Sequence, residues 1–192
     1  MLINPLMAQT VNVVGFGDSL MAGYQLPGDE AFPKRLETAL VNLGYDLTIQ
    51  NAGVSGDTTS GGLARLNWSV PDETDLVILE LGGNDALRGI TPDITQANLD
   101  QMIEALKARQ IDVILVGILA PPNMGDSYSA AFNPIFEELA QKHELVLYPF
   151  FLDGVITDPS LMLADGIHPN DDGTKVMAER FLPLMTQYLD TR

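Results

Sequence analysis

The 192-residue chain contains no cysteine. A disulfide, a thiolate nucleophile and a cysteine-based zinc or iron–sulfur site are therefore excluded. For the same reason, cysteine usage gives no information on the redox compartment. Histidine is almost as scarce, because His143 and His168 are the only two in the sequence. Any imidazole that acts as a base or as a metal ligand must be one of these two.

Positive charge is scarce as well. Lysine and arginine together number 10, against 26 aspartates and glutamates, and the formal net charge is -16. An acidic field of this size repels nucleic-acid phosphates and anionic lipid head groups. We therefore expect no nucleic-acid partner.

Long hydrophobic runs are also missing. No apolar segment approaches the roughly 20 residues needed to span a bilayer, so we expect no stable membrane insertion. Hydrophobic residues still make up 46% of the chain, enough to bury a substantial core. The sequence predicts a single domain over residues 11–192, with a monomer favoured. Residues 1–10 are mildly apolar but lack a basic n-region, and they are predicted to be an N-terminal extension or a signal-peptide remnant.

Short β-branched or aliphatic runs alternate with longer segments of helical period, which is typical of repeated βα units around a parallel sheet. The predicted strands are Val11–Gly17, Asp46–Asn51, Asp75–Leu81, Ile111–Ile118 and Leu145–Tyr148. The predicted long helices are Glu30–Leu43, Pro92–Gln110, Tyr128–His143 and Gly173–Leu189. Prolines inside the last two predict a late start or a kink in each. The fold class is α/β, and ligands are expected at the carboxyl ends of the strands.

The first predicted strand runs into Gly15-Phe16-Gly17-Asp18-Ser19-Leu20. This segment places a serine hydroxyl at the carboxyl edge of the sheet, where a nucleophile is exposed and its own N–H can meet an oxyanion. A helix-capping serine and a dinucleotide-binding loop are the alternatives at this point. The dinucleotide motif fails at Leu20, which stands where it requires Gly or Ala, and Met21 excludes the Gly-x-Ser-x-Gly elbow of α/β-hydrolases.

Two further strand ends carry hydrogen-bond donors. The second strand runs into the loop Asn51–Thr58, where Gly53 could present its N–H to an oxyanion, although a plain turn explains the same residues. The third strand ends in Gly82-Gly83-Asn84-Asp85, and a positioned asparagine amide also donates to an oxyanion. Taken alone, Asn84 is equally well explained as a helix or turn cap.

The segment Asp165-Gly166-Ile167-His168 precedes the last predicted helix. On a turn, this spacing lets Asp165 accept the Nδ1–H of His168, so that Nε2 can serve as a base. A metal site is the alternative, but one histidine with scattered carboxylates is a poor zinc set, so we expect no metal. His143 lies near the end of an amphipathic helix and is predicted to be a solvated surface residue.

Together, these four segments resemble the four motif blocks of the SGNH (GDSL) hydrolases. The matching residues, in block order, are Gly17-Asp18-Ser19-Leu20, then Gly53, then Gly82-Gly83-Asn84-Asp85, and finally Asp165-x-x-His168. The segments Asn51–Thr58, Gly62–Leu66, Leu79–Asp85 with Leu87–Gly89, and Asp165–Asn170 are further similar to one bacterial branch. That branch holds arylesterases and multifunctional acyl-CoA thioesterase–lysophospholipases.

The resemblance implies a three-layer α/β/α sandwich of the flavodoxin-like type and no cofactor. Ser19 would be the nucleophile, His168 the general base and acid, and Asp165 the orienting carboxylate. The N–H groups of Ser19 and Gly53 and the side chain of Asn84 would form the oxyanion hole. The reaction implied is hydrolysis of aryl or acyl carboxylic esters, extending to lysophospholipids and acyl thioesters. A carbohydrate O-acetyl esterase of the same fold is the alternative.

The substrate is expected to be a small-molecule ester. The residues predicted to contact it are Asp18, Leu20, Pro122, Met124 and Ile167. The resemblance implies that the loop holding Asp126 borders the acyl site, and a carboxylate near that rim means that a preference for long-chain thioesters is not simply inherited. The net charge favours neutral or zwitterionic esters over acyl-CoA. The resemblance also implies a periplasmic or secreted protein, with the cytoplasm as the alternative.

Overall fold

The computed structural model describes residues 10–192, so the predicted N-terminal extension lies, apart from Thr10, outside the described residues. The chain forms one sheet of parallel strands in the order β2-β1-β3-β4-β5. The strands are β1 (Val11–Gly17), β2 (Leu47–Gly53), β3 (Leu76–Glu80), β4 (Asp112–Val116) and β5 (Val146–Tyr148). The predicted five-stranded parallel sheet is confirmed.

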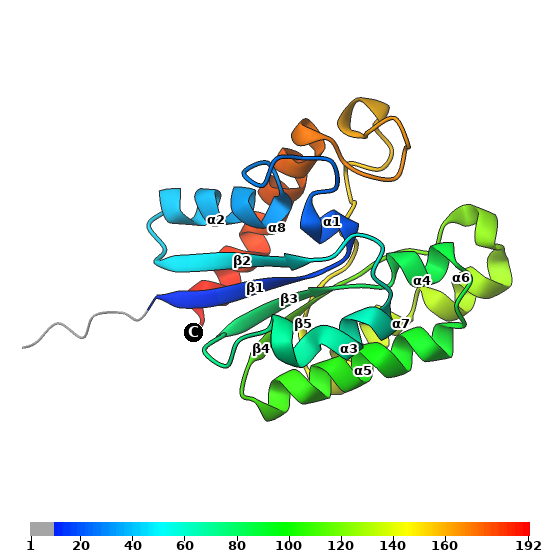
Figure 1. Cartoon of the computed structure of the whole chain (residues 1–192), viewed down its shortest axis with the longest axis horizontal. Coiled ribbons are helices and arrows are strands. Elements are labelled where there is room, and N and C mark those ends of the chain that lie inside the picture. Colours follow the sequence, from blue (N-terminus) through cyan, green and yellow to red (C-terminus); the bar gives the residue numbers. More distant parts are fainter. Residues whose placement is uncertain (1–9) are drawn as a thin grey trace, which may run out of the picture.

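Helices cover both faces of this sheet and give the three layers visible in Figure 1. The helices are α1 (Ser19–Ala22), α2 (Phe32–Asn42), α3 (Thr59–Ser69), α4 (Gly83–Leu87), α5 (Pro92–Ala108), α6 (Asp126–Phe132), α7 (Ile135–His143) and α8 (Asp171–Asp190). Two 3-10 turns, η1 (Pro122–Met124) and η2 (Pro159–Leu161), lie in the connections. One face carries α1, α2 and α8, and the other carries α3, α5 and α7.

The ends of β1 and β3 lie next to each other in the middle of the sheet. Phe16 pairs with Leu79 near these ends. From β1 the chain goes on to β2 on one side, whereas from β3 it goes on to β4 on the other. This is the topological switch point, where open α/β sheets bind their ligands. The residues that follow the two strands therefore share the position that favours a site.

The central strands are buried on both faces because helices cover both. All five residues of β3 are buried, and Glu80 at its end is 0% exposed. A charged residue at that depth is uncommon unless it is paired or neutralised. Glu80 is therefore the residue of β3 that packing alone does not explain.

Aromatic packing fixes the last helix on the sheet. Phe32 of α2 meets Phe151, after β5, edge-on at a centroid distance of 4.8 Å, and it meets Phe181 of α8 at 5.4 Å. All three rings are at most 1% exposed. Edge-to-face pairs of this kind contribute about 0.5–1.5 kcal/mol beyond area burial. They anchor the helix whose first turn follows His168.

The structure corrects one predicted helix and adds others. The predicted helix Tyr128–His143 is two helices, α6 and α7, because Pro134 at the break has no N–H to continue the α6 ladder. Asn133 beside it accepts the Ala120 N–H through its side chain at 2.9 Å. The short helices α1 and α4 and the longer α3 were not predicted. By contrast, α8 runs through Pro183 as one helix.

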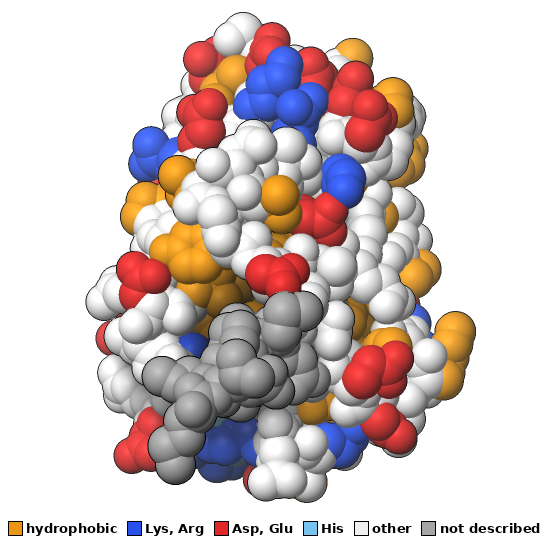
Figure 2. Space-filling view, turned by 90° about the vertical axis from the view of Figure 1, so that its left-hand side faces the viewer, with side chains coloured by type: hydrophobic (Ala, Val, Ile, Leu, Met, Phe, Trp, Pro, Cys, Tyr) orange, Lys and Arg blue, Asp and Glu red, His pale blue; other side chains and the backbone are white. Residues whose placement is uncertain are grey.

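Two hollows lie away from the carboxyl ends of β1 and β3. One, of about 400 Å³, is at the amino ends of the strands, the face shown in Figure 2, where apolar side chains line a depression between charged groups. The other, of about 430 Å³, is beside β5 and is lined by Tyr148, Pro149, Phe150, Asp153 and Arg180. No helix within residues 10–192 has the length and apolar character needed to cross a membrane.

Gly117, just after β4, is expected to be intolerant of a side chain. A Cβ there would lie 2.1 Å from the carbonyl oxygen of Pro149, a backbone atom that cannot move aside on its own. We predict that Gly117→Ala lowers the free energy of unfolding by about 1–3 kcal/mol, as overpacking does. Gly28→Ala is the matched control, because nothing lies within 4 Å of that position. Urea denaturation of both variants checks this, and equal stabilities would contradict it.

Candidate active site

Ser19 lies at the junction of β1 and α1. Asp18 caps this helix, and its Oδ1 accepts the N–H of Leu20 at 3.0 Å. Gly23 ends the helix in the left-handed conformation with φ 76°. Within residues 10–192 the Ser19 N–H donates to no protein acceptor. The nucleophile candidate therefore begins a helix with its own N–H unused.

His168 lies on a loop that backbone hydrogen bonds tie to the segment before it. The Leu163 N–H donates to the His168 carbonyl at 2.7 Å, and the Asn170 N–H donates to the Leu161 carbonyl at 2.9 Å. Asn170 also caps α8 by accepting the Gly173 N–H at 3.0 Å. The start of α8 and the loop before it thus determine where the imidazole lies.

The three residues predicted as a triad lie in one hydrogen-bonded chain. His168 Nε2 is 2.8 Å from Ser19 Oγ, and His168 Nδ1 is 2.7 Å from Asp165 Oδ2. Asp165 Oδ1 accepts the backbone N–H groups of His168 at 3.0 Å and of Ile167 at 2.9 Å. The backbone N–H of His168, the imidazole and the Ile167 N–H lower the pKa of Asp165 to about 2. Asp165 therefore stays ionised throughout the ordinary pH range.

Tyr24 contacts the same imidazole, although the sequence reasoning missed it. Its ring centroid is 4.3 Å from that of His168, with the planes tilted by 34°. Its backbone N–H donates to the Ser19 carbonyl at 3.1 Å. Tyr24 follows the glycine that ends α1, and a large aromatic five residues after the serine was the available signal.

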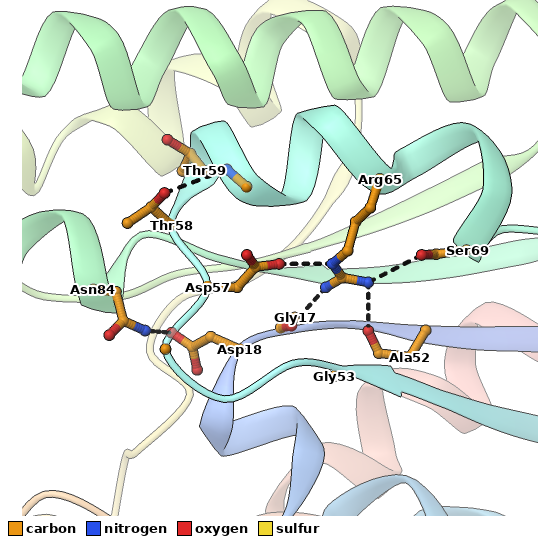
Figure 3. A network of polar contacts seen from close by, with 12 residues as sticks. Gly17, Asp18, Ala52, Gly53, Asp57, Thr58, Thr59, Arg65, Ser69 and Asn84 are labelled. Atoms are coloured by element: carbon orange, nitrogen blue, oxygen red, sulfur yellow. Dashed lines mark hydrogen bonds and ion pairs between the residues drawn. The ribbon is translucent and has the colours of Figure 1, made fainter.

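Asn84 is held at the end of β3 by its neighbours. Gly82 has φ 126°, which a residue with a side chain rarely adopts, and lets the chain turn sharply into α4. The buried Asp85 accepts the Thr59 N–H at 2.8 Å and the Thr95 hydroxyl at 3.2 Å, which ties α4 to α3 and α5. Asn84 Nδ2 donates one hydrogen to Asp18 Oδ2 at 3.0 Å (Figure 3). Its second amide hydrogen remains for another acceptor.

The structure disagrees with the prediction that Gly53 donates to an oxyanion. The Gly53 N–H donates to Asn51 Oδ1 at 2.9 Å. A Cβ on Gly53 would lie 2.3 Å from the Ala22 nitrogen, so this glycine is needed for close packing against α1. The Asn-x-Gly spacing was a signal that the asparagine carbonyl would take this N–H.

Gly56, three residues later in the loop after β2, is the glycine with an unused N–H. Its φ is 84°, and none of the hydrogen bonds formed by residues 10–192 uses its N–H. Arg88 donates to the Gly56 carbonyl at 2.8 Å and so fixes the loop from the α4 side. The loop after β2 therefore offers a free backbone donor, at a different residue from the one predicted.

Comparison with known proteins identifies the family of the chain. Residues 16–176 match the GDSL-like lipase/acylhydrolase family. The chain belongs to this family. It is 44% identical over 164 residues to an arylesterase of Vibrio mimicus, a match that covers 85% of this chain and 82% of that protein.

Two further relatives support the same assignment. The chain is 39% identical over 166 residues to thioesterase 1/protease 1/lysophospholipase L1 of Escherichia coli K12, covering 85% of this chain and 77% of that protein. A crystal structure of TesA matches with a TM-score of 0.83 and 41% identity, over 91% of this chain and 97% of that one. As a member of the GDSL-like family, the chain is a carboxylic ester hydrolase with the α/β/α fold.

Two of the five predicted substrate contacts in this family member are buried instead. Asp18 is 2% exposed and Leu20 is 8% exposed, and the Asp18 carboxylate is already bonded to Leu20 and Asn84. Ile167, beside His168, is 42% exposed, as a substrate contact requires. Pro122 is exposed, and Met124 lies beside Gly89 after α4. The predicted residues on the later loops thus remain available.

Two carboxyl groups lie buried beneath the nucleophile of this hydrolase. Glu80 Oε2 accepts the Asp18 N–H at 3.2 Å, and Glu80 Oε1 has no partner among the described residues. Burial raises the pKa of Asp18 to about 6. Burial, together with the nearby Asp18 carboxylate, raises the pKa of Glu80 well above its usual value. Burial therefore favours the neutral form of Glu80.

One group in residues 10–192 has the composition of a metal site, namely Asp100, Glu104 and His143, whose ligand atoms lie within 4.8 Å of one another. Lys142 Nζ is 2.7 Å from both oxygens of Asp100, so an ammonium already neutralises that carboxylate. The prediction that His143 is a solvated surface residue is wrong. Its side chain is 9% exposed, and Nε2 lies 2.6 Å from Asp100.

We predict that Glu80→Gln makes stability less dependent on pH. Because the folded-state pKa of Glu80 is raised, this carboxyl group keeps its proton in the folded protein at pH values above about 4.5, where it ionises in the unfolded chain, so its contribution to wild-type stability falls as pH rises. Glutamine has the same shape and no proton to lose. The stability of Glu80→Gln relative to wild type should rise with pH, by at most about 1.4 kcal/mol per pH unit.

Urea denaturation of both proteins at several pH values from 5 to 8 provides the measurement. Glu179→Gln, at an exposed position on α8, controls for the removal of one negative charge. If the stability of Glu80→Gln relative to wild type stays constant or falls with rising pH, the raised pKa of Glu80 is contradicted.

Proposed function

We propose that the chain hydrolyses carboxylic esters through an acyl-enzyme formed on Ser19. The observation that carries the proposal is the hydrogen-bonded chain from Ser19 Oγ through His168 to Asp165. His168 Nε2 takes the hydroxyl proton as Oγ attacks the ester carbonyl, and then gives that proton to the departing alcohol. Water, deprotonated by the same nitrogen, releases the acid and restores the serine. Asp165, ionised throughout, keeps Nδ1 protonated and stabilises the imidazolium.

The oxyanion would be held by three donors. Two are the unused N–H of Ser19 and the second amide hydrogen of Asn84. For the third we propose the N–H of Gly56 in place of Gly53, because the Gly53 N–H is bonded to Asn51. Donors of this kind act by stabilising charge that develops only in the transition state.

The proposed substrates are neutral or zwitterionic aryl and acyl esters. Large apolar side chains are exposed at the carboxyl edge of the sheet, namely Val54 after β2, Leu87 at the end of α4, Leu119 after β4 and Ile167 beside the base. They offer an apolar surface to an acyl or aryl group. The net charge of -16 disfavours polyanionic substrates. The names of the relatives extend the proposal to lysophospholipids and acyl thioesters.

One copy of the chain is proposed to suffice for catalysis, because it supplies the triad and all three donors. We propose that it acts as a monomer in the periplasm or outside the cell. The compartment rests on the family resemblance, which implies a periplasmic or secreted protein.

Ser19→Ala is predicted to abolish ester hydrolysis while leaving the fold intact, because the change removes only the Oγ atom, whose hydrogen-bond partner is the His168 imidazole. The measurement is hydrolysis of a short aryl ester by wild type and variant, with circular dichroism to confirm folding. A phosphonate ester should label wild type at Ser19 and leave the variant unlabelled. Substantial activity in the variant would exclude the acyl-enzyme on Ser19.

The same assay with aryl esters of increasing chain length tests the substrate class. Turnover that continues beyond a few carbons supports the acyl-ester proposal. Turnover confined to acetyl groups, and best on acetylated sugars, would favour the carbohydrate O-acetyl esterase instead. The rate on a thioester of the same acyl length, compared with the rate on the ester and with Ser19→Ala as the blank, measures the preference for esters over thioesters.

Asn84→Ala is predicted to lower kcat by about 10²–10³-fold with a small change in KM, because it removes a donor that acts mainly in the transition state. Asn98→Ala is the control. Asn98 also donates through its side-chain amide, to Thr59 and Ser60, and touches no triad residue. Equal kcat values for the two variants would remove Asn84 from the proposed oxyanion hole.

A further inference from the structure

Arg65 of α3 is a buried arginine whose guanidinium contacts several backbone carbonyls. The residue is 7% exposed. Its Nε donates to Asp57 Oδ2 at 2.6 Å, Nη2 to the Gly17 carbonyl at 2.9 Å, and Nη1 to the Ala52 carbonyl at 2.9 Å. Nη1 also donates to Ser69 Oγ at 3.3 Å. Figure 3 shows these partners converging on the guanidinium from different elements.

The partners of Arg65 are adjacent to the proposed catalytic groups. Gly17 is the last residue of β1 and is followed by Asp18 and Ser19. Ala52 belongs to the end of β2, and Asp57 directly follows Gly56 in the next loop. One guanidinium therefore ties the strand end that leads to the nucleophile to the loop that carries the free Gly56 N–H.

The geometry of this link is set by the shape of the arginine side chain. A guanidinium is planar and presents its donors in a rigid fork, which an ammonium cannot reproduce. The plane is packed over the ring of Phe16 in β1, with Cζ 4.0 Å from the ring centroid. The Asp57 carboxylate, whose side chain is 14% exposed, is neutralised by the same group. The link that the Arg65 guanidinium makes between Gly17, Ala52 and Asp57 is therefore fixed in distance and in orientation.

We propose that Arg65 is a positioning residue for ester hydrolysis, one that sets the spacing between the Ser19 N–H and the Gly56 N–H by clamping Gly17, Ala52 and Asp57. The inference rests on the proposed function, because it presupposes that these two N–H groups hold the oxyanion. Arg65 itself touches no triad residue. Its effect is on the transition state, since substrate binding in the ground state needs no such spacing.

The test compares Arg65→Met and Arg65→Lys with Arg109→Met. Arg109 is a matched control, because its Nη2 donates to the carbonyls of Val70 and Pro71 and to Asp72, in the connection that leads into β3 at the opposite edge of the sheet. We expect kcat on a short aryl ester to fall about 10²-fold in both Arg65 variants, the scale of a misplacement of about 1 Å. KM should change by less than about threefold. Arg109→Met should lower the melting temperature and leave kcat unchanged.

Rates of Ser19 labelling by the phosphonate ester supply a second measurement, because phosphonylation also develops negative charge on oxygen. The labelling rate should fall in the Arg65 variants and stay unchanged in Arg109→Met.

If Arg65→Met does not fold, the proposal is tested with Arg65→Lys alone, because lysine keeps the positive charge and most of the aliphatic side chain. A folded Arg65→Lys with wild-type kcat and labelling rate would overturn the proposal, as would equal losses of kcat in Arg65→Met and Arg109→Met. Activity that survives Ser19→Ala would instead contradict the proposed function, before Arg65 is in question.

Discussion

The site depends on one buried carboxylate, that of Asp18. Its two oxygens accept the Leu20 N–H at the start of α1 and the Asn84 amide after β3. The residue is 2% exposed, so water cannot replace either partner, and losing one would leave a buried group unpaired. The separation between nucleophile and amide donor is therefore fixed beneath the surface, before any substrate arrives.

The acid–base half of the site is built on a different plan. Asp165 and His168 lie three residues apart on one exposed turn, and the same carboxylate that orients the imidazole also accepts two N–H groups of that turn. The shape of the Asp165–His168 turn is thus determined by residues of the turn itself. The position of this turn relative to Ser19 depends on distant residues, because it is set by the cap of α8 at Asn170 and by the packing of Phe181 in the core.

The sequence was sufficient to predict those features that depend on a single strand or a single turn. The bounds of β1 and the Asp165–His168 turn follow from local pattern and spacing, and both agree with the structure. It was insufficient where partners come from distant segments. The spacing of Asn51 and Gly53 signalled that the Gly53 N–H is taken, but only the fold shows that the Gly56 N–H is free and that the distant Arg88 holds its loop. His143 has a surface pattern, yet Asp100, 43 residues away, removes it from solvent.

Glu80 supports the turn on which the Ser19 N–H is left unpaired. The first N–H groups of a helix have no partner within the helix and must find one elsewhere. Here the Asp18 N–H donates to Glu80, and the Leu20 N–H donates to Asp18. The Ser19 N–H between them is left unpaired, at the position where an oxyanion would form. Burying a carboxyl group is costly unless it is neutral, and the raised pKa of Glu80 favours its neutral form. An apolar residue at position 80 would remove that cost. The Asp18 N–H would then lose its acceptor, and the turn between β1 and α1 would lose the hydrogen bond that ties it to β3.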